Sequence, residues 1–131
     1  MEKNFLGIDY GSKRIGLALA GEKERIAKAF KIIHKITELD DIVPAKGVMA
    51  FVIGLPLQPD GTEGETARNA RLFANRLEEK YHLPIYWQDE TKTSLRAESF
   101  LKDTLFMRPD KRKAVLDAES ARVILQQWLN C

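Results

Sequence analysis

Two short apolar runs separated by a tight turn constrain the fold of this chain more than any other feature. The first run is Asn4 to Tyr10, the second is Arg14 to Ala20, and only Gly11-Ser12-Lys13 lies between them. Because so short a link joins antiparallel strands, we expect a β-hairpin at the start of the sheet. Ala29 to His34 is a weaker apolar run and is expected to form the third strand.

The rest of the chain alternates between expected helices and strands. The continuous apolar run Val48 to Ile53 is typical of a central strand that is buried on both faces. After a turn-rich loop, Thr62-x-x-Glu65 has the pattern of a capping box at a helix start. The other expected elements are a helix from Glu38 to Lys46 with Thr37 as its cap, a helix carrying Ala67, Ala70, Ala74, Leu77 and Tyr81 that ends at His82-Leu83-Pro84, a strand from Ile85 to Gln88, a helix from about Ser94 to Leu105 capped by Thr93, and a last helix from about Lys113 to Leu129. A hairpin followed by βαβ units predicts a mixed sheet with helices on its faces.

The composition favours a single globular domain over residues 1–131 and excludes several other classes. Hydrophobic residues make up 44% of the 131 residues and charged residues 31%, which is ordinary for one folded domain. The single cysteine, Cys131, excludes an internal disulfide framework and a cysteine metal cluster. No apolar run is long enough for a transmembrane helix, and the residues after Met1 do not resemble a secretory signal. We therefore expect a cytoplasmic protein with no membrane partner.

The charge balance bears on the partners. Lys and Arg number 21 and Asp and Glu number 19, which gives a net charge of +2. A protein that only grips phosphate backbones is usually more basic. The balance suits a nucleic-acid enzyme that keeps acids in its site and bases around it, although it does not require one.

Asp9 is an acidic residue in a position where a core strand would prefer an apolar one. It lies inside the first apolar run and shares a strand face with Phe5 and Gly7. An unpaired carboxylate on a buried face costs several kcal/mol, so a function is one explanation. The alternative is that Asp9 is simply the last residue of the strand before the Gly11 turn.

Two further acidic positions raise the same question. Asp89-Glu90 directly follows an expected strand, where sites form in α/β proteins, or is a solvated pair that favours the next helix start. Asp117 shares an expected helix stripe with Ala121, Ile124 and Trp128. The alternative for Asp117 is a helix that begins later, near Ala114, with the acid in its first turn.

Carboxylates that converge from strands and a helix suit divalent metal ions. Mg²⁺ and Mn²⁺ prefer oxygen ligands, and two such ions can activate water and stabilise the leaving oxygen of a phosphodiester. The two histidines, His34 and His82, are far apart in sequence and are expected at the surface or core edge. The loop at Gly54-Leu55-Pro56 lacks the Lys-Ser/Thr of a Walker loop, although its backbone N–H groups and the next helix could hold a phosphate.

Four motifs resemble, in the same order, those of the YqgF (RuvX) family, which is described both as pre-16S rRNA nucleases and as Holliday junction resolvases. The matching segments are Gly7 to Ala18, Gly54-Leu55-Pro56 with Asp60-Gly61 and Glu65-Thr66-Ala67, Asp89-Glu90-Thr91-x-Thr93-Ser94-x-x-Ala97, and Asp117-Ala118-Glu119-Ser120-Ala121-x-x-Ile124-Leu125. The chain departs from the family at Thr91, where Arg is usual, and at Ser120, where alanine is usual. The first departure concerns substrate binding at that corner rather than metal binding.

The resemblance implies an α/β fold of the ribonuclease H-like kind. Its sheet is five-stranded and mixed, in the order 3-2-1-4-5, with helices on both faces. Asp9, Glu90 and Asp117 would be the catalytic carboxylates and ligands of Mg²⁺ or Mn²⁺, and Asp89 is the neighbour that could replace Glu90. We expect Glu90 to be the ligand, because strand neighbours point to opposite faces and Glu reaches further than Asp.

Basic residues are the candidates for substrate binding. The resemblance implies that Lys13 and Arg14 lie near phosphates, although Arg14 could equally pair with a site acid. The segment from Phe106 to Lys113 is expected to be a loop that contacts the phosphate backbone through Arg108, Lys111, Arg112 and Lys113. The alternative is an ordinary solvated loop.

The leading hypothesis is a metal-dependent endonuclease that matures the 5′ end of precursor 16S rRNA, with RNA and precursor ribosomal particles as partners. One alternative is a four-way DNA junction resolvase, which would act as a dimer. Another is a non-catalytic nucleic-acid-binding assembly factor. Nothing in the sequence reports the 2′-hydroxyl contact that separates RNA from DNA, and both a monomer and a weak homodimer remain open.

Overall fold

The architecture is described from a computed structural model of the chain. The structure describes residues 3–90 and 109–131, and within the second range it describes side chains from residue 115 onward. Its elements are β1 (Asn4–Tyr10), β2 (Ile15–Gly21), β3 (Ala27–Ile33), the 3₁₀ helix η1 (Ile36–Glu38), α1 (Leu39–Ala45), β4 (Val48–Pro56), α2 (Glu65–Tyr81), β5 (Ile85–Glu90) and α4 (Pro109–Leu129). The expected helix from Ser94 to Leu105, with its cap Thr93, lies outside the described residues.

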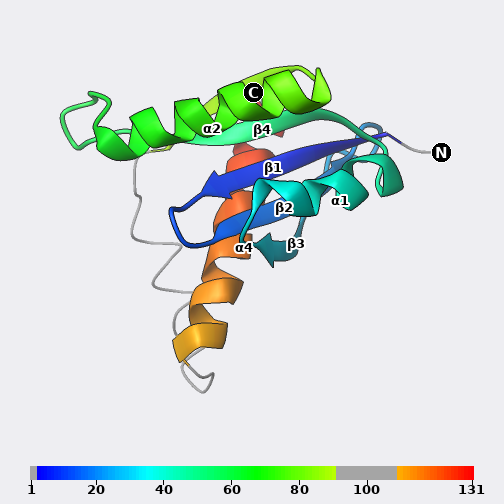
Figure 1. Cartoon of the computed structure of the whole chain (residues 1–131), viewed down its shortest axis with the longest axis horizontal. Coiled ribbons are helices and arrows are strands. Elements are labelled where there is room, and N and C mark those ends of the chain that lie inside the picture. The colour runs from blue at the N-terminus through cyan, green and yellow to red at the C-terminus, as the bar shows by residue number, and fades with distance from the viewer. Residues whose placement is uncertain (1–2, 91–108) are drawn as a thin grey trace.

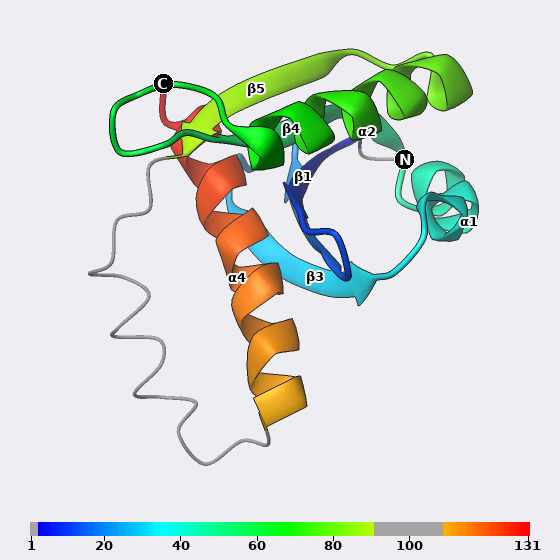
Figure 2. The ribbon, with the colours of Figure 1, turned by 60° about the vertical axis from the view of Figure 1, so that its left-hand side comes forward.

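The strands form one mixed sheet in the order β3-β2-β1-β4-β5. Figure 1 labels the first four strands of the chain, and Figure 2 shows β5 beside β4. The strands β1, β2 and β3 pair antiparallel, and β4 and β5 continue the sheet parallel to β1. The hairpin and the strand order expected from the sequence are therefore confirmed. The antiparallel part comes from the short turn after Tyr10, and the parallel part comes from helical crossovers.

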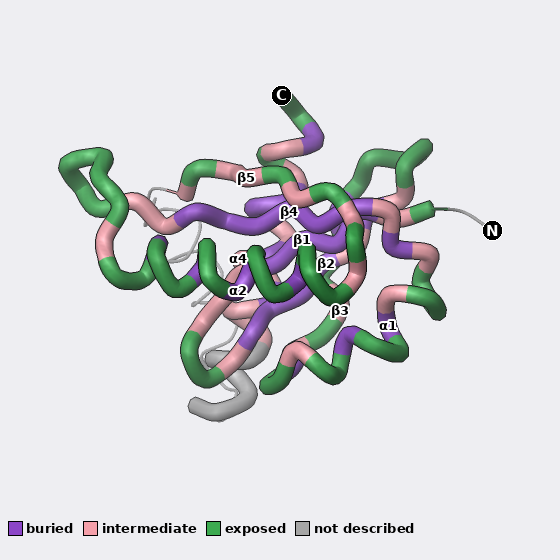
Figure 3. The backbone as a smooth tube through the Cα atoms, turned by 45° about the horizontal axis from the view of Figure 1, so that its top comes forward, coloured by how far each residue is buried: buried purple, intermediate pink, exposed green. Residues whose placement is uncertain are grey.

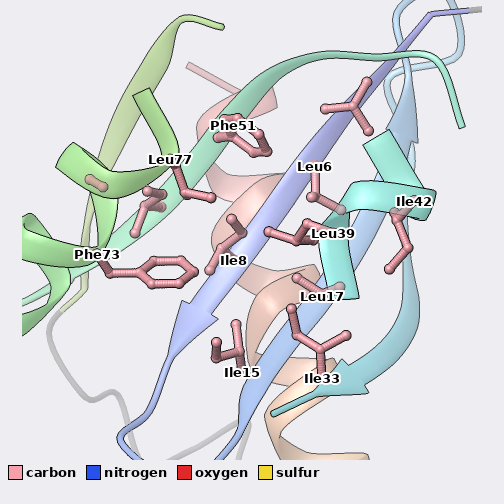
Figure 4. Close-up of a cluster of buried hydrophobic side chains, with 13 residues drawn as sticks. Leu6, Ile8, Ile15, Leu17, Ile33, Leu39, Ile42, Phe51, Phe73 and Leu77 are labelled. Atoms are coloured by element: carbon pink, nitrogen blue, oxygen red, sulfur yellow. The ribbon is translucent and has the colours of Figure 1, made fainter. Parts of the chain in front are cut away.

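Helices cover both faces of the sheet (Figure 2). On one face, α1 and α2 pack on the core side chains Leu6, Ile8, Ile15, Leu17, Ile33, Phe51 and Ile53, many of which Figure 4 shows. On the other face, α4 packs through Ala121, Ile124, Leu125 and Leu129 on Phe5, Ala18, Ala50 and Val52. The period of two along β1 divides its side chains between these two cores.

The strongest sequence patterns coincide with the most buried elements. The apolar run of β4 is buried from Ala50 to Leu55 and passes through the centre of the molecule (Figure 3). Helix α2 buries Ala67, Ala70, Phe73, Ala74 and Leu77, the one-sided spacing of a helix that packs on a sheet. It ends at Tyr81, and the C-cap residue His82 adopts the left-handed conformation that closes many helices.

Two of the three expected helix caps, those at Thr37 and Thr62, are wrong. Helix α2 begins at Glu65 after Gly64, and its start has no side-chain cap. The Thr62 hydroxyl lies 2.6 Å from Asp60 Oδ1, and Asp60 also accepts from the Thr62 backbone N–H. The nearer carboxylate therefore holds Thr62 in a local turn, so that it does not cap the helix.

A carboxylate also replaces Thr37 at the first helical turns. Thr37 lies inside η1, and Glu38 Oε2 accepts hydrogen bonds from the backbone N–H groups of His34 (2.5 Å) and Lys35 (2.9 Å). Helix α1 follows from Leu39. Glu38 thus satisfies two backbone donors ahead of the helix, because a carboxylate accepts more hydrogen bonds than a hydroxyl can.

Several strand and helix ends also differ from the expected ones. Strand β4 continues to Pro56 and β5 continues to Glu90, so the acidic pair belongs to the strand. Helix α4 begins at Pro109, a residue suited to a first helical turn, rather than near Lys113 or Ala114. Within the described parts of the chain, no helix is long and apolar enough to cross a membrane.

Candidate active site

Asp9 lies near the end of β1 on the face that α4 covers. It shares that face with Phe5, which packs against Trp128 of α4 at a ring-centroid distance of 5.2 Å. Beyond Asp9, the chain turns through residues 11–13 into β2. A pocket of about 230 Å³ opens there, lined by Asp9, Gly11, Ser12, Lys13, Arg14 and Asp117.

Asp117 reaches this pocket because α4 rests directly on β2. A Cβ atom on Gly16 would lie only 2.0 Å from the backbone oxygen of Asp117. Gly7 in β1 likewise permits α4 to approach the sheet, because a Cβ on this residue would lie 2.7 Å from Leu125 Cβ. Sequence analysis missed this role of Gly16, although a glycine inside a strand is a signal of close backbone approach.

The position of Asp117 settles one alternative left open by the sequence. Because α4 begins at Pro109, Asp117 lies in the third turn and not in the first. Its stripe partners Ala121 and Ile124 are buried against the sheet, and Trp128 packs on Phe5. Asp117 therefore faces the sheet from inside the helix, beyond the first turn that the helix dipole favours for acids.

Arg14 pairs with Asp117 across the pocket. Arg14 Nε donates to Asp117 Oδ2 at 3.0 Å, and the two side chains are 31% and 32% exposed. The sequence left two roles open for Arg14, which were binding a phosphate and pairing with a site acid. The structure contains the ion pair with Asp117. Lys13 is exposed at the rim, and its backbone oxygen lies 3.2 Å from Nδ1 of His34. The contact of His34 with the pocket rim is a second feature that the sequence did not reveal.

Asp89 and Glu90 lie on opposite faces of the sheet. A Cβ on Gly54 would lie 3.1 Å from Glu90 Oε2 and 2.5 Å from Ile124 Cδ1, so Glu90 is on the face that α4 covers. Tyr86, four residues earlier on the same face, stacks on Trp128 at 4.9 Å. Asp89 is exposed on the other face, where its charge contributes to raising the pKa of Arg71, after the hydrogen bond and charge of Glu63.

The three predicted acids are thus on one face, and two of them line one pocket. Asp9 and Asp117 line the same pocket, whereas Glu90 lies by Gly54 and Ile124. In the ranges that the structure describes, no three His, Cys, Asp or Glu side chains are close enough together to hold a metal ion. Asp9 and Asp117 fit a hard cation as oxygen donors in an accessible pocket, and Glu90 on the same face is the third candidate ligand.

The remaining predicted site residues lie partly outside the described structure. Lys111, Arg112 and Lys113 belong to the first turns of α4, so the expected loop is wrong there, and their side chains are not described. Arg108 lies outside the described residues. Their predicted contact with phosphate stays a prediction.

A larger hollow lies on the opposite face, between α2 and β5. Its volume is about 460 Å³, and it is lined by Arg71, Ala74, Asn75, Glu78, Leu83, Pro84, Ile85 and Trp87. The Arg71 guanidinium lies 4.9 Å from the Trp87 ring centroid and pairs with Glu63. Asp9 and Asp117 line the smaller pocket and do not line this hollow, so the smaller pocket is the candidate active site.

The strand order, the helices on both faces and the acidic pocket at the end of β1 define a protein of the ribonuclease H-like class. The structure of Thermus thermophilus RuvC in complex with a Holliday junction substrate is similar, with a TM-score of 0.53 and 13% identity over 97% of this chain and 93% of that one. A second structure of RuvC from this organism gives 0.51 at 12% identity, over 96% and 93%. At these identities the likeness establishes the fold.

Sequence comparison identifies the family within this class. The model of the RuvX family, described as Holliday junction resolvase, matches residues 3–131, and the chain belongs to this family of nucleases, which are hydrolases of phosphodiester bonds. A Burkholderia ambifaria (strain MC40-6) protein named "Putative pre-16S rRNA nuclease" is 39% identical over 98% of this chain and 90% of its own length. A protein of the same name from Burkholderia cenocepacia (strain HI2424) is 38% identical over the same shares of the two chains.

Proposed function

We propose that this protein is a Mg²⁺- or Mn²⁺-dependent endonuclease that matures the 5′ end of precursor 16S rRNA in the cytoplasm. One observation carries the proposal: Asp9 and Asp117 meet in a pocket whose rim carries Lys13 and Arg14. Such a pocket combines oxygen ligands for a metal with cations for a phosphate. The names of the relatives support RNA as the substrate.

Each residue of the pocket has a separate task in this proposal. Asp9 and Asp117 would hold the metal ion, which supplies a Lewis acid that activates water and stabilises the leaving oxygen. Arg14 and Lys13 bind and orient the phosphate, because guanidinium and ammonium groups donate charge-assisted hydrogen bonds to its oxygens. Glu90, on the same sheet face, is the third candidate ligand.

The second candidate function is resolution of a four-way DNA junction. It is favoured by the description of the family and by the fold shared with a RuvC that was solved on such a junction. Symmetric cutting of two strands would require a dimer. The third candidate, a nucleic-acid-binding factor without catalysis, leaves the acidic pocket unexplained.

The deciding experiment offers both nucleic acids to one preparation. Purified protein is incubated with end-labelled precursor 16S rRNA and with a synthetic four-way junction, each in Mg²⁺, Mn²⁺ or EDTA. Cleavage near the 5′ end of the rRNA that EDTA stops supports the proposal. Cleavage of the junction alone supports the second function, and binding without cleavage in all three conditions supports the third.

A further inference from the structure

We propose that Arg14 is an exchangeable cation, which neutralises Asp117 until a divalent metal ion takes its place and then binds a phosphate of the substrate. The inference rests on the proposed function, since it concerns the regulation of the same site. It assigns one side chain to two successive partners. It predicts that the metal and Arg14 compete for Asp117 before they cooperate on the substrate.

The backbone around Arg14 fixes this side chain beside Asp117. Arg14 immediately precedes β2, and Gly16 two residues later lies on the same strand face, where it touches the Asp117 backbone. A Cβ on Gly11 would lie 2.6 Å from the Arg14 backbone oxygen, so the turn also closes tightly on Arg14. The ion pair therefore follows from two close backbone approaches.

The ion pair itself is of a kind that exchanges at low cost. It joins Arg14 Nε to one oxygen, Asp117 Oδ2, at 3.0 Å, and both side chains are about one-third exposed. Arg71, in contrast, contacts both oxygens of Glu63, through Nε at 2.5 Å and Nη2 at 3.1 Å. Because partly exposed ion pairs contribute little net stability, a divalent ion can displace Arg14 from the carboxylate.

The same carboxylate is what a metal ion in this pocket would bind. Asp9 and Asp117 line one pocket with Arg14, so a cation held by both carboxylates would contact the partner of Arg14. Two positive groups repel at such short range, and Arg14 then needs another anion. A phosphate offers the fork of oxygens that guanidinium groups prefer, and Lys13 on the same rim adds a second positive charge.

If Arg14 exchanges between Asp117 and a phosphate, Arg14→Gln should change Mn²⁺ affinity and RNA affinity in opposite directions. Without the competing charge, the protein alone should bind Mn²⁺ more tightly, by about two- to fivefold, the range that corresponds to partly exposed ion pairs. Without the phosphate partner, it should bind RNA more weakly. A residue that only positions Asp117 would weaken metal binding when it is removed, and a residue that only binds phosphate would leave metal binding unchanged.

The test measures metal and RNA binding separately, without cleavage. Mn²⁺ affinity is followed by the electron paramagnetic resonance of free Mn²⁺ in the absence of RNA, and binding of a labelled rRNA fragment is followed by fluorescence anisotropy in Ca²⁺. Arg14→Lys retains the charge, so its Mn²⁺ affinity should stay closer to that of the unaltered protein. Lys13→Gln is the matched control, because it removes a charge from the same pocket without removing the partner of Asp117.

Tighter Mn²⁺ binding by Arg14→Gln than by Lys13→Gln, together with weaker RNA binding, supports the exchange. Unchanged or weaker Mn²⁺ binding by Arg14→Gln, or equal tightening by Lys13→Gln, overturns it. If Arg14→Gln does not fold by circular dichroism, Arg14→Met, which keeps the aliphatic part of the side chain and removes the charge, replaces it in both measurements: tighter Mn²⁺ binding with weaker RNA binding supports the exchange, and unchanged or weaker Mn²⁺ binding overturns it. Failure of the unaltered protein to cleave any substrate would contradict the proposed function while leaving these affinities interpretable.

Discussion

The backbone of Asp117 lies directly on Gly16, so closely that a Cβ on this glycine would stand 2.0 Å from the Asp117 carbonyl oxygen. The contact joins the last helix to the second strand. It delivers the Asp117 carboxylate to the pocket that Asp9 and Arg14 also line. The absence of a side chain at residue 16 is therefore a condition for assembling the site.

Gly16→Ala should both destabilise the protein and disturb the site. The added methyl group meets backbone rather than a movable side chain, so α4 must shift, at a cost of about 1–3 kcal/mol or more in unfolding free energy. Urea unfolding measures this loss. Gly64→Ala is the control, because its Cβ would meet the end of the flexible Gln58 side chain. Equal stability of the two variants would show that α4 does not rest on Gly16.

Asp9→Asn should lose cleavage while it keeps the fold. Asparagine retains the shape of the side chain but lacks the negative charge that would hold a divalent ion, and the rate should fall by at least about 100-fold. Cleavage of precursor rRNA in Mn²⁺ measures the rate, and a melting curve in EDTA checks the fold. Glu79→Gln, on the exposed side of α2, is the control for loss of one acid. A fully active Asp9→Asn enzyme would remove the basis of the metal site.

Glu90→Gln and Asp89→Asn should separate the two acids at the end of β5. Glu90 is on the α4 face, beside Gly54, whereas Asp89 is exposed on the α2 face. We expect Glu90→Gln to abolish cleavage with little change in melting temperature, and Asp89→Asn to retain activity. The assignment is reversed if the first variant still cuts and the second does not.

Acid should remove the contribution of Glu38 to stability. Hydrogen bonds from the backbone N–H groups of His34 and Lys35 lower the pKa of Glu38 from its usual value of 4.5. A lowered pKa means that the folded state favours the charged carboxylate, so its stabilisation is full above pH 4.5 and is lost as the pH falls through the lower, folded-state pKa. Glu38→Gln should melt at a lower temperature than the unaltered protein at pH 7, and the difference should shrink below pH 4. Glu79→Gln serves as the control, and a difference that persists unchanged in acid would contradict this account.

Replacing Arg108, Lys111, Arg112 and Lys113 with alanine should flatten the salt dependence of RNA binding. Each lost phosphate contact should reduce the slope of log K against log salt concentration by about 0.7 for single-stranded RNA. Anisotropy titrations between low and moderate salt measure the slope. An unchanged slope would mean that these residues do not touch phosphate.

Local patterns were sufficient to predict the sheet, since apolar runs and a short turn act between neighbours in sequence. The run of β4 and the buried spacing of α2 are such patterns. The caps failed where a nearby carboxylate takes the local hydrogen bonds: Asp60 accepts from the backbone N–H and hydroxyl of Thr62, and Glu38 accepts from the backbone N–H groups of His34 and Lys35.

The site was predicted as a set of residues but not as a geometry. Asp9, Glu90 and Asp117 do share one face, as strand alternation and the helix stripe indicated. The pair Arg14–Asp117, by contrast, joins residues 103 positions apart. Its formation depends on how closely α4 approaches β2, a distance set by tertiary packing on Gly16.

The position of α4 in the chain also determines when the pocket can form during synthesis of the protein. One wall, from Asp9 to Arg14, leaves the translating ribosome early, whereas Asp117 follows some hundred residues later. A nascent chain that lacks α4 has the hairpin but neither the second carboxylate nor the helix that covers Phe5, Ala18 and Val52. The proposed metal site would therefore form only once α4 docks on the sheet and completes this core, and we expect a nascent chain without α4 not to cleave nucleic acid.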